Sequence, residues 1–455
     1  SEAGSCRQRA DWIHGMNSTR LFTLLAQQSG FDALVSVGRV QTPTLKIVVD
    51  RDREIDNFKP TDHYLPTGWF LHENGKFKAV WEIPSDHEGV DFEGRLTDKA
   101  VAQKVLDRIA GKPSEVTAFQ ASEKKTAQPL PFNLSKLQKT CSAKFGLTAQ
   151  KTLEVAQSLY ETHKVATYPR TDSQYLPTSL LSDEAGPILD ALSGCDDYAT
   201  AVKNADRSIK SAAWNDSKVS DHHGIVPTTD FKPSKLQSLN DVERKVFDLI
   251  AKHFIAQFYP QARHLAMSAT VDVDGDRFKA SGRREIDLAW KKVVGHGGAD
   301  DEDEKDEDGN DGGLPDMKKG DSVSAESTEI QSKRTKPPSR FTDGTLIDAM
   351  TAVHKFVTDQ KVRQRLREND GLGTEATRAN IIETLIRRTF LKRKGKQLVS
   401  TDLGKSVIDQ VPGEVSDSGM TALWESFLDA IAKGEFDPDE FMSAQADLLR
   451  KRVEA

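Results

Sequence analysis

Hydrophobic positions follow two different periods along this chain. Residues 10–55 carry apolar side chains at helical spacing, and the segment 42–49 continues a second helix after the first. From Tyr64 the pattern changes to short alternating runs, such as residues 68–71 and 77–81. Such alternation is typical of antiparallel strands with one buried face. The chain is therefore predicted to begin with helices and to continue into a β-sheet.

The strand pattern is interrupted by a long helical stretch. It pauses near Ala121, where helices begin, and returns at residues 266–273. A sheet split in sequence by a helical insert of roughly 140 residues implies that the insert folds as a separate lobe. From Pro337 onward the chain is again predicted to be helical. We therefore expect a multidomain α+β protein.

The composition describes a polar protein of several domains. Its 455 residues are 37% hydrophobic and 29% charged, and a chain of this length usually divides into more than one domain. There is no run of about 18 apolar residues, so no membrane span is indicated. Residues 1–5 have neither the basic start nor the apolar core of a secretory signal. We expect a cytoplasmic protein with no membrane partner.

Neither the cysteines nor the acidic residues indicate a metal site. Cys6, Cys141 and Cys195 are far apart and form no Cys-X-X-Cys pair, which argues against a disulfide framework and a zinc ribbon. Residues 300–311 hold nine acids and one lysine, a net charge of −8, within the glycine-flanked segment 297–313. Acids without ordered spacing indicate a solvated loop. The whole chain carries −7, so the remainder is +1, with local basic stretches that suit a protein holding nucleic acid along a channel.

The candidate chemistry centres on residues 166–173, Ala-Thr-Tyr-Pro-Arg-Thr-Asp-Ser, where a predicted helix gives way to a loop. A tyrosine hydroxyl can attack a phosphodiester and conserve the bond energy as a phosphotyrosine, so that the strand is resealed without ATP. Arg170 follows Tyr168 by two residues, and its guanidinium suits the charge that develops on the phosphate. Taken alone, this pair favours the simpler interpretation, a partly buried tyrosine beside a surface arginine.

Neighbouring segments supply groups that suit the same chemistry. A helix with Thr148 as its predicted N-cap places Gln157 and Glu161 one turn apart, on the face that precedes the tyrosine loop. Further along, His222 and His223 form a histidine pair beside an aspartate. A histidine there can hydrogen-bond a phosphate or take part in proton transfer.

Four segments together carry a resemblance to a known family. They are SVGRVQTP at residues 36–43, QSLYE with TYPRTDS within residues 157–173, DHHGIVPT at residues 221–228 and GLGTEATRA at residues 371–379. In this order they resemble the motifs of the type IA DNA topoisomerases, most closely the topoisomerase III branch. Gly224 departs from the pattern, because the family commonly has alanine there. The resemblance spans residues 11–425, nearly the whole chain.

The resemblance implies a toroid with a helical base, a split antiparallel β arch and a helical catalytic lobe, with winged-helix-like elements. The expected domains are the first part of the base (1–60), the first part of the arch (61–120), the catalytic tyrosine lobe (121–262), the second part of the arch with the acidic loop 297–313 (263–335) and the second part of the base (336–455). In the last of these, a helix through residues 381–386 precedes a basic run at 390–399. We interpret this run as a winged-helix hairpin that contacts phosphate, the alternative being a solvated basic turn.

The resemblance also implies an activity and a set of site residues. Members of this family are ATP-independent isomerases that cleave single-stranded DNA through a 5′-phosphotyrosine, pass a strand and religate, relaxing negative supercoils or decatenating DNA. Tyr168 would be the nucleophile, Arg170 would stabilise the transition state and His222 would contact the scissile phosphate. Active-site support is expected from Gln157, Glu161, Thr167, Thr171 and Asp172. Single-stranded DNA on the base side is expected to meet Arg39, Gln41, Thr374, Thr377 and Arg378.

The magnesium of this family is held by a TOPRIM domain that precedes the segments described above. The first 60 residues here show no strand-rich α/β pattern. We therefore expect the TOPRIM domain to be absent from this sequence, with Mg²⁺ bound only in a full-length enzyme and no metal bound by this chain. The expected partners are single-stranded, negatively supercoiled or catenated DNA, and we expect a monomer.

Two other functions compete with a strand-passing enzyme. Without the TOPRIM domain, the chain is alternatively a catalytically incomplete clamp for single-stranded DNA. A tyrosine recombinase or relaxase also uses a tyrosine nucleophile, but the arginine and histidine patterns of those enzymes are not seen here. The strand-passing enzyme remains the first hypothesis.

Overall fold

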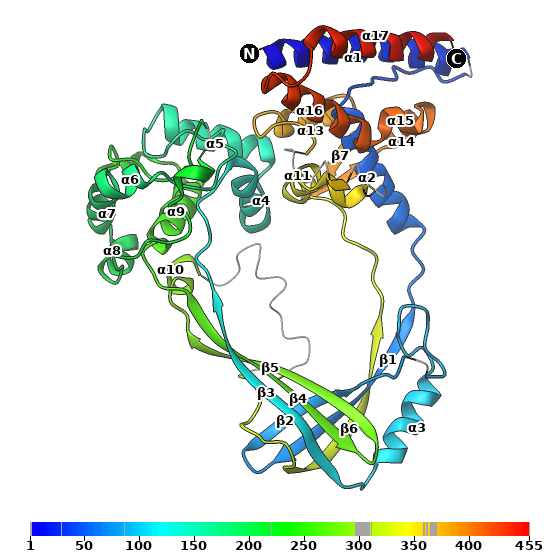
Figure 1. Cartoon of the computed structure of the whole chain (residues 1–455), viewed down its shortest axis with the longest axis vertical. Coiled ribbons are helices and arrows are strands. Elements are labelled where there is room, and N and C mark those ends of the chain that lie inside the picture. Colours follow the sequence, from blue (N-terminus) through cyan, green and yellow to red (C-terminus); the bar gives the residue numbers. More distant parts are fainter. Residues whose placement is uncertain are drawn as a thin grey trace.

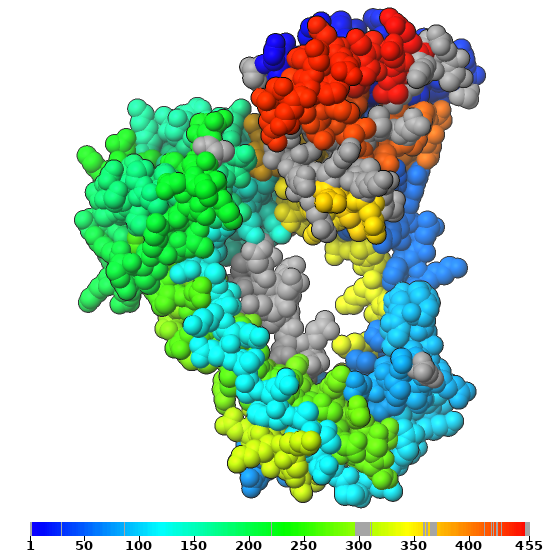
Figure 2. All heavy atoms as spheres, viewed as in Figure 1, coloured from blue at the N-terminus to red at the C-terminus, as the bar shows by residue number. Residues whose placement is uncertain are grey.

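The computed structural model describes residues 2–28, 30–85, 87–219, 221–295, 310, 312–357, 360, 363–364 and 371–454. These residues form a ring, with a helical base at one end, a β barrel at the other and a helical lobe along one side (Figure 1). Figure 2 shows an opening between the base and the barrel. The predicted acidic loop lies almost wholly outside the described residues.

The base is assembled from both ends of the chain. Its elements are α1 (Glu2–Gln28), α2 (Gln41–Asp56), α11 (Asp343–Thr351), η4 (Val353–Phe356), α13 (Arg378–Arg387), β7 (Leu391–Lys394), β8 (Gln397–Ser400), α14 (Asp402–Gln410), α15 (Gly413–Ser416), α16 (Ser418–Ala432) and α17 (Pro438–Glu454). Helix α1 buries Ala10, His14, Ser18 and Phe22, a four-residue spacing that keeps one face against its neighbours. Those neighbours are α16 and α17, so the two chain ends pack together (Figure 1).

The predicted basic hairpin is present as β7 and β8, paired in antiparallel register from Leu391↔Ser400 to Lys394↔Gln397. It directly follows α13, as a wing follows its helix. Arg393 on β7 is held by two carboxylates, with Nη2 2.8 Å from Asp343 Oδ2 and 2.6 Å from Glu383 Oε1. These ion pairs raise the pKa of Arg393 against the opposing effect of burial, so the side chain stays charged. Phosphate contact by the wing stays a prediction.

The arch is a closed antiparallel barrel of strands from two separate parts of the sequence. Its elements are β1 (Asp62–His72), β2 (Gly75–Trp81), α3 (Lys99–Ile109), β3 (Ser114–Thr126), β4 (Ala262–Val273), β5 (Asp276–Asp287) and β6 (Ser322–Arg334), with strand order β1-β2-β5-β4-β3-β6. The short helix α10 (Lys291–Val294) follows β5 and packs against the helical lobe. Pairing of β3 with β4 and of β1 with β6 joins the two parts. The predicted split antiparallel arch is therefore confirmed, with closure into a barrel as an added feature.

A buried asparagine completes the barrel where two strands diverge. Between β2 and β5, only Val80 and Trp81 are in register with the neighbouring strand. Asn310 bridges the gap: its Oδ1 accepts from the Lys78 N–H at 2.8 Å, and its Nδ2 donates to the carbonyls of Lys78 and Ser281, each at 2.9 Å. One side chain thus supplies hydrogen bonds that the missing strand pairing would have made.

The lobe predicted to carry the catalytic tyrosine is helical and lies between the two halves of the arch in sequence. Its elements are α4 (Leu134–Phe145), α5 (Ala149–Glu161), α6 (Thr178–Asp183), α7 (Ala185–Ser193), α8 (Asp196–Lys203), η1 (Asp216–Lys218), η2 (Pro233–Ser238) and α9 (Asp241–Ala256). Its core includes the stacked rings of Phe231 and Phe247. Helix α9 begins with a capping box, in which Asn240 and Glu243 each accept from the other's backbone N–H.

The lobe meets the base along α4 and α11, and this contact, which we call the seam, closes the ring (Figure 1). Gly344 of α11 makes the close approach possible, because a Cβ there would lie 2.8 Å from Lys139 Cα. An ion pair joins Lys139 Nζ to Asp348 Oδ2 at 2.5 Å. The multidomain α+β toroid predicted from the sequence is thereby confirmed, while the domain limits stay predictions. In the described residues, no helix is long and apolar enough to span a membrane.

Candidate active site and nucleic-acid groove

The loop that carries Tyr168 is fixed by a short backbone pairing with the loop that carries His222. Ala166 forms an antiparallel bridge with Pro227. The Thr167 N–H donates to the Val226 carbonyl at 2.9 Å, and the Val226 N–H donates back to Thr167 Oγ1 at 3.0 Å. The tyrosine loop and the histidine loop, which α6, α7 and α8 separate in the sequence, are thereby placed side by side.

The ring of Tyr168 lies between two other rings. Its centroid is 4.4 Å from that of His222, with the planes tilted by 40°, and 5.6 Å from that of Tyr160, which meets it edge-on. Such aromatic contacts each contribute about 0.5–1.5 kcal/mol beyond area burial. They restrict the rotation of a half-buried tyrosine, so the hydroxyl is presented from a defined direction.

Arg170 is oriented by Gln157 on the last turns of α5. With the amide oxygen of Gln157 facing the guanidinium, it accepts from Arg170 Nη2 at 2.7 Å and from Nε at 3.2 Å. Arg170 nevertheless remains exposed. An oriented and accessible guanidinium two residues from the tyrosine is suited to a phosphate.

The remaining support residues divide into loop-holding and surface positions. Thr171 is buried, and its Oγ1 donates to the His222 carbonyl at 3.3 Å while accepting from the Ser173 N–H at 3.1 Å. Asp172 is exposed, and its carbonyl accepts from Asn133 Nδ2 at 3.0 Å. Within the described residues, the exposed side chain of Glu161 makes no hydrogen bond or ion pair. Thr171 therefore holds the two loops together, and Glu161 lies at the surface at the end of α5.

Steric crowding explains why glycine stands at position 224, where the family motif commonly has alanine. A Cβ there would approach Pro131 Cβ to 3.1 Å and the carbonyl carbon of Gln174 to 3.2 Å. Alanine would require its neighbours to move by a few tenths of an ångström. The adjacent His223 Nδ1 lies 2.8 Å from the Gly224 carbonyl, so this histidine contacts the backbone of its own loop.

Four of the five residues predicted to bind DNA on the base side meet at one groove. Arg39, Gln41, Thr374 and Thr377 line a pocket of about 710 Å³ between α1, the start of α2 and the start of α13. Arg39 Nε lies 2.5 Å from Asp11 Oδ1, so the carboxylate of Asp11 neutralises part of the positive charge of Arg39. The groove joins three segments that are far apart in sequence.

Two further residues line this groove that the sequence analysis did not assign to the DNA-binding set on the base. Arg388 donates to Gln41 Oε1 at 2.7 Å and also to Ser36 Oγ, and so fixes the amide of Gln41. Burial lowers the pKa of the Arg388 guanidinium, and the neighbouring Arg387 acts in the same direction. Trp12 also lines the pocket and is 65% exposed. An aromatic side chain beside cations is the signal that would have found it.

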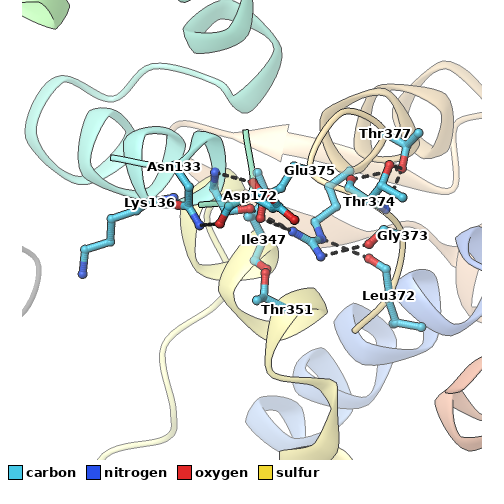
Figure 3. Close-up of polar contacts among 12 residues, drawn as sticks. Asn133, Lys136, Asp172, Ile347, Thr351, Leu372, Gly373, Thr374, Glu375 and Thr377 are labelled. Atoms are coloured by element: carbon cyan, nitrogen blue, oxygen red, sulfur yellow. Dashed lines mark hydrogen bonds and ion pairs between the residues drawn. The ribbon is translucent and has the colours of Figure 1, made fainter. Parts of the chain in front are cut away.

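Arg378 lies behind the groove instead of lining it. The side chain is 1% exposed, and its donors reach the carbonyls of Leu372 and Gly373 at 3.1 and 2.9 Å. Its Nη1 also reaches Ser135 Oγ at 3.0 Å and Glu375 Oε1 at 2.8 Å. Figure 3 places Glu375 between the Asn133 end of the lobe and the Thr374–Thr377 turn. In this closed ring Arg378 contacts protein, and a direct contact with DNA stays a prediction.

The described residues do not provide the magnesium site that the resemblance implies. They contain no group of three or more His, Cys, Asp or Glu side chains placed to hold a metal ion. Asp50 and Asp52 have the spacing of a metal-binding pair, but both are otherwise engaged. Asp50 pairs with Lys46 at 2.5 Å, and the buried Asp52 accepts from Ser400 and Arg340. Their environment is that of structural carboxylates.

The chain is similar to known DNA topoisomerases over its whole length. Residues 1–443 match a family model described as DNA topoisomerase. DNA topoisomerase 3 of Vibrio cholerae is 39% identical over 100% of this chain and 70% of its own length, and that of Salmonella typhimurium is 38% identical over 98% and 68%. DNA topoisomerase 3 of Bacillus subtilis is 36% identical over 96% and 58%. Full-length topoisomerase I from Thermotoga maritima shares the fold, with a TM-score of 0.70 at 23% identity over 99% of this chain and 68% of that one.

Proposed function

This chain belongs to the type IA DNA topoisomerase family, and from this premise we propose that Tyr168 is the nucleophile that cuts one DNA strand. The enzyme cleaves and rejoins single strands and so changes DNA topology. The observation that carries the assignment of the residue is the placement of the Tyr168 ring against His222, with Arg170 oriented by Gln157 on the same lobe.

In the proposed reaction, Tyr168 Oη attacks the phosphorus of a phosphodiester. The bond to the 3′ oxygen breaks, the 5′ phosphate remains on the tyrosine, and the tyrosine proton ends on the leaving 3′ hydroxyl. Religation is the reverse, with the 3′ hydroxyl attacking phosphorus and tyrosine leaving, so no nucleotide is consumed. Arg170 would hold the extra negative charge of the transition state, and His222 would hydrogen-bond the same phosphate.

We propose that the strand reaches Tyr168 from the groove on the base. Arg39, Gln41, Thr374 and Thr377 would contact it through backbone phosphates and polar groups, without reading sequence in a duplex groove. Single-stranded regions of negatively supercoiled or catenated DNA are the proposed substrates, and the enzyme is proposed to act as a monomer in the cytoplasm. We propose that Mg²⁺ is bound by a TOPRIM domain outside the described residues, because the described residues do not form a magnesium site.

The test uses the complete natural protein and an end-labelled single-stranded oligonucleotide, with the adduct trapped in detergent. We expect a covalent adduct on the 5′ end of the cut strand, and Tyr168→Phe should abolish it. Tyr160→Phe is the matched control, because it removes a hydroxyl from the neighbouring ring and leaves the ring contact in place. Arg170→Ala should slow cleavage by about 10²–10³-fold, the usual effect of losing one transition-state donor.

The competing function is a clamp that binds single strands without turnover. The similarity to enzymes named DNA topoisomerase 3 favours cleavage over the clamp. An adduct that persists in Tyr168→Phe would refute the assignment of the nucleophile. Tight binding of the oligonucleotide by the complete protein, with no adduct from the unsubstituted protein, would support the clamp.

A further inference from the structure

We propose that Glu375 and Arg378 are positioning residues that clasp the catalytic lobe to the base and couple the groove to the tyrosine loop. This inference rests on the proposed function, because it assigns to the clasp the control of a ring that must be closed for cleavage and open for strand passage. Neither residue touches the reacting atoms. Their action passes through the first turn of α4 (Figure 3).

The first turn of α4 has four backbone N–H groups with no partner inside the helix, as every helix does. The N-cap side chain satisfies one of them, because Asn133 Oδ1 accepts from the Lys136 N–H at 2.9 Å, and the first bond within the helix runs from the Leu137 N–H to the Asn133 carbonyl at 3.0 Å. Two more of these groups find partners outside the helix. Leu134 N–H donates to the Thr171 carbonyl at 3.1 Å, and Ser135 N–H donates to Glu375 Oε2 at 2.6 Å.

The Glu375 bond is the one that crosses from the base to the lobe. A carboxylate at a helix N-terminus is favoured by the helix dipole as well as by the hydrogen bond. Arg378 Nη1 braces the arrangement, because it donates both to Glu375 Oε1 at 2.8 Å and to Ser135 Oγ at 3.0 Å. The clasp thus joins a buried cation, a carboxylate and a helix end.

On the base side, the clasp shares a turn with two groove residues. Thr374 and Thr377 line the groove, and their hydroxyls lie 3.0 Å apart. Glu375 and Arg378 follow each of them by one residue, so the two pairs alternate along the turn that leads into α13. A strand held by the first pair therefore rests on the turn that positions the second.

On the lobe side, the same helix end holds the tyrosine loop. Asn133 Nδ2 donates to the Asp172 carbonyl at 3.0 Å, and Leu134 N–H donates to that of Thr171. These two residues follow Arg170 directly in sequence. Movement of α4 away from the base would carry the tyrosine loop with it, whereas closure of the clasp sets where Tyr168 meets a strand lying on the base.

The seam contains a second contact of the same kind, which gives an independent reporter. Asp343 Oδ2 of the base accepts from Ala149 N–H, the first amide of α5, at 3.0 Å. Ala149 is fully buried, and this bond is made only while the seam is closed. If the seam opens as a unit, weakening the clasp at α4 must also expose the Ala149 amide. If Glu375 acts only locally, that amide is unaffected.

The experiment measures hydrogen exchange of the Ala149 amide in the complete natural protein, without DNA. Losing a charge-assisted hydrogen bond should increase the open fraction about tenfold, which corresponds to about 1.4 kcal/mol. We therefore expect Glu375→Ala to lower the protection of this amide about tenfold, and Glu375→Gln, which keeps an acceptor, to restore part of it. Amides in the middle of α9 report global unfolding and should not change.

Asp98→Ala is the matched control. Asp98 accepts from the Ala100 and Val101 N–H groups and so caps α3, but it lies within the arch and does not cross the seam. We expect it to leave the Ala149 amide protected. Unchanged protection in a folded Glu375→Ala variant, or an equal loss in Asp98→Ala, would overturn the clasp.

Adduct formation separates the clasp from the proposed function. In Glu375→Ala we expect the affinity for a single-stranded oligonucleotide to stay within about twofold, because the groove residues are intact. The rate of adduct formation should fall about tenfold, because the end of α4 that holds the tyrosine loop is no longer fixed against the base. A full rate of adduct formation with reduced protection refutes the coupling and leaves Tyr168 as the nucleophile. An adduct that does not depend on Tyr168 refutes the proposed function instead.

Discussion

Gly344 offers a substitution whose effects on the seam and on its own helix have opposite signs. It is the second residue of α11, and a Cβ there would lie 2.8 Å from Lys139 Cα, 2.9 Å from Ser142 Cβ and 3.1 Å from the Lys139 carbonyl oxygen. Ordinary contact begins at 3.4 Å. Because most of these atoms belong to the backbone, no side-chain rotation relieves the clash, and α4 must move away from α11.

The magnitude follows from two opposing terms. Overpacking of this kind costs about 1–3 kcal/mol, and the cost is felt only in the closed ring. Alanine in place of glycine inside a helix contributes about 0.5–1 kcal/mol of stability in both the open and the closed ring. Gly344→Ala should therefore shift the ring toward the open state by about 5- to 150-fold without destabilising the base itself.

Hydrogen exchange measures both terms in one sample. We expect the Ala149 amide, which is held by Asp343 across the seam, to lose protection, while the amides of β7 and β8 in the base keep theirs or gain. Gly186→Ala is the control, because Gly186 is likewise the second residue of a helix, α7, and a Cβ there meets nothing within 4 Å. If Gly344→Ala leaves Ala149 as protected as Gly186→Ala does, the seam does not depend on the close approach of α4 and α11 and the reasoning fails.

Two further predictions concern stability. Asp52 is buried and accepts from the Ser400 N–H and Oγ at 2.7 and 2.6 Å, as well as from Arg340, so Asp52→Ala should cost about 3–5 kcal/mol in denaturant unfolding, whereas an effect below 1 kcal/mol would contradict a structural role. Burial tends to raise the pKa of Glu243, but hydrogen bonds, led by that from Ser158 Oγ, outweigh it and hold the pKa below the ordinary 4.5. A carboxylate with a depressed pKa stabilises the fold above about pH 4.5, and this contribution is lost as the pH falls through the folded-state pKa. Glu243→Gln should therefore flatten the acid side of the stability profile, and an unchanged profile would refute this.

The sequence pattern predicted the strand segments but not how they close. Alternation identified residues 68–71, 77–81 and 266–273, which lie in β1, β2 and β4. Closure depends on β1 pairing with β6, far away in sequence, and alternation within a strand carries no information about its partner. The role of Asn310 could not be predicted from the sequence either, because its three hydrogen bonds depend on where β2 and β5 diverge.

The site was predicted as a set of residues, while their orientations were not. Ordered motifs grouped Tyr168 with Arg170 and His222, and the structure brings these onto adjoining loops. The motif around Thr374 was interpreted as one DNA-binding surface, but its residues point in two directions. The two pairs alternate along the turn that leads into α13, and only tertiary packing decides which pair meets the groove and which, as with Arg378, meets the lobe.

The chemistry of the seam suits a ring that has to open repeatedly. A seam of large apolar side chains would lose about 25 cal/mol for each Å² exposed to water on every opening. Here the contacts across the seam include N–H groups at helix ends, two carboxylates and the Lys139–Asp348 ion pair. Water replaces such partners at a net cost of only about 0.5–3 kcal/mol per hydrogen bond, because both sides stay solvated when apart. The same bonds demand good geometry when made, so the closed ring is well defined although it is easy to open. A polar seam therefore reconciles the fixed position that the proposed cleavage by Tyr168 requires with the wide separation that the proposed strand passage requires.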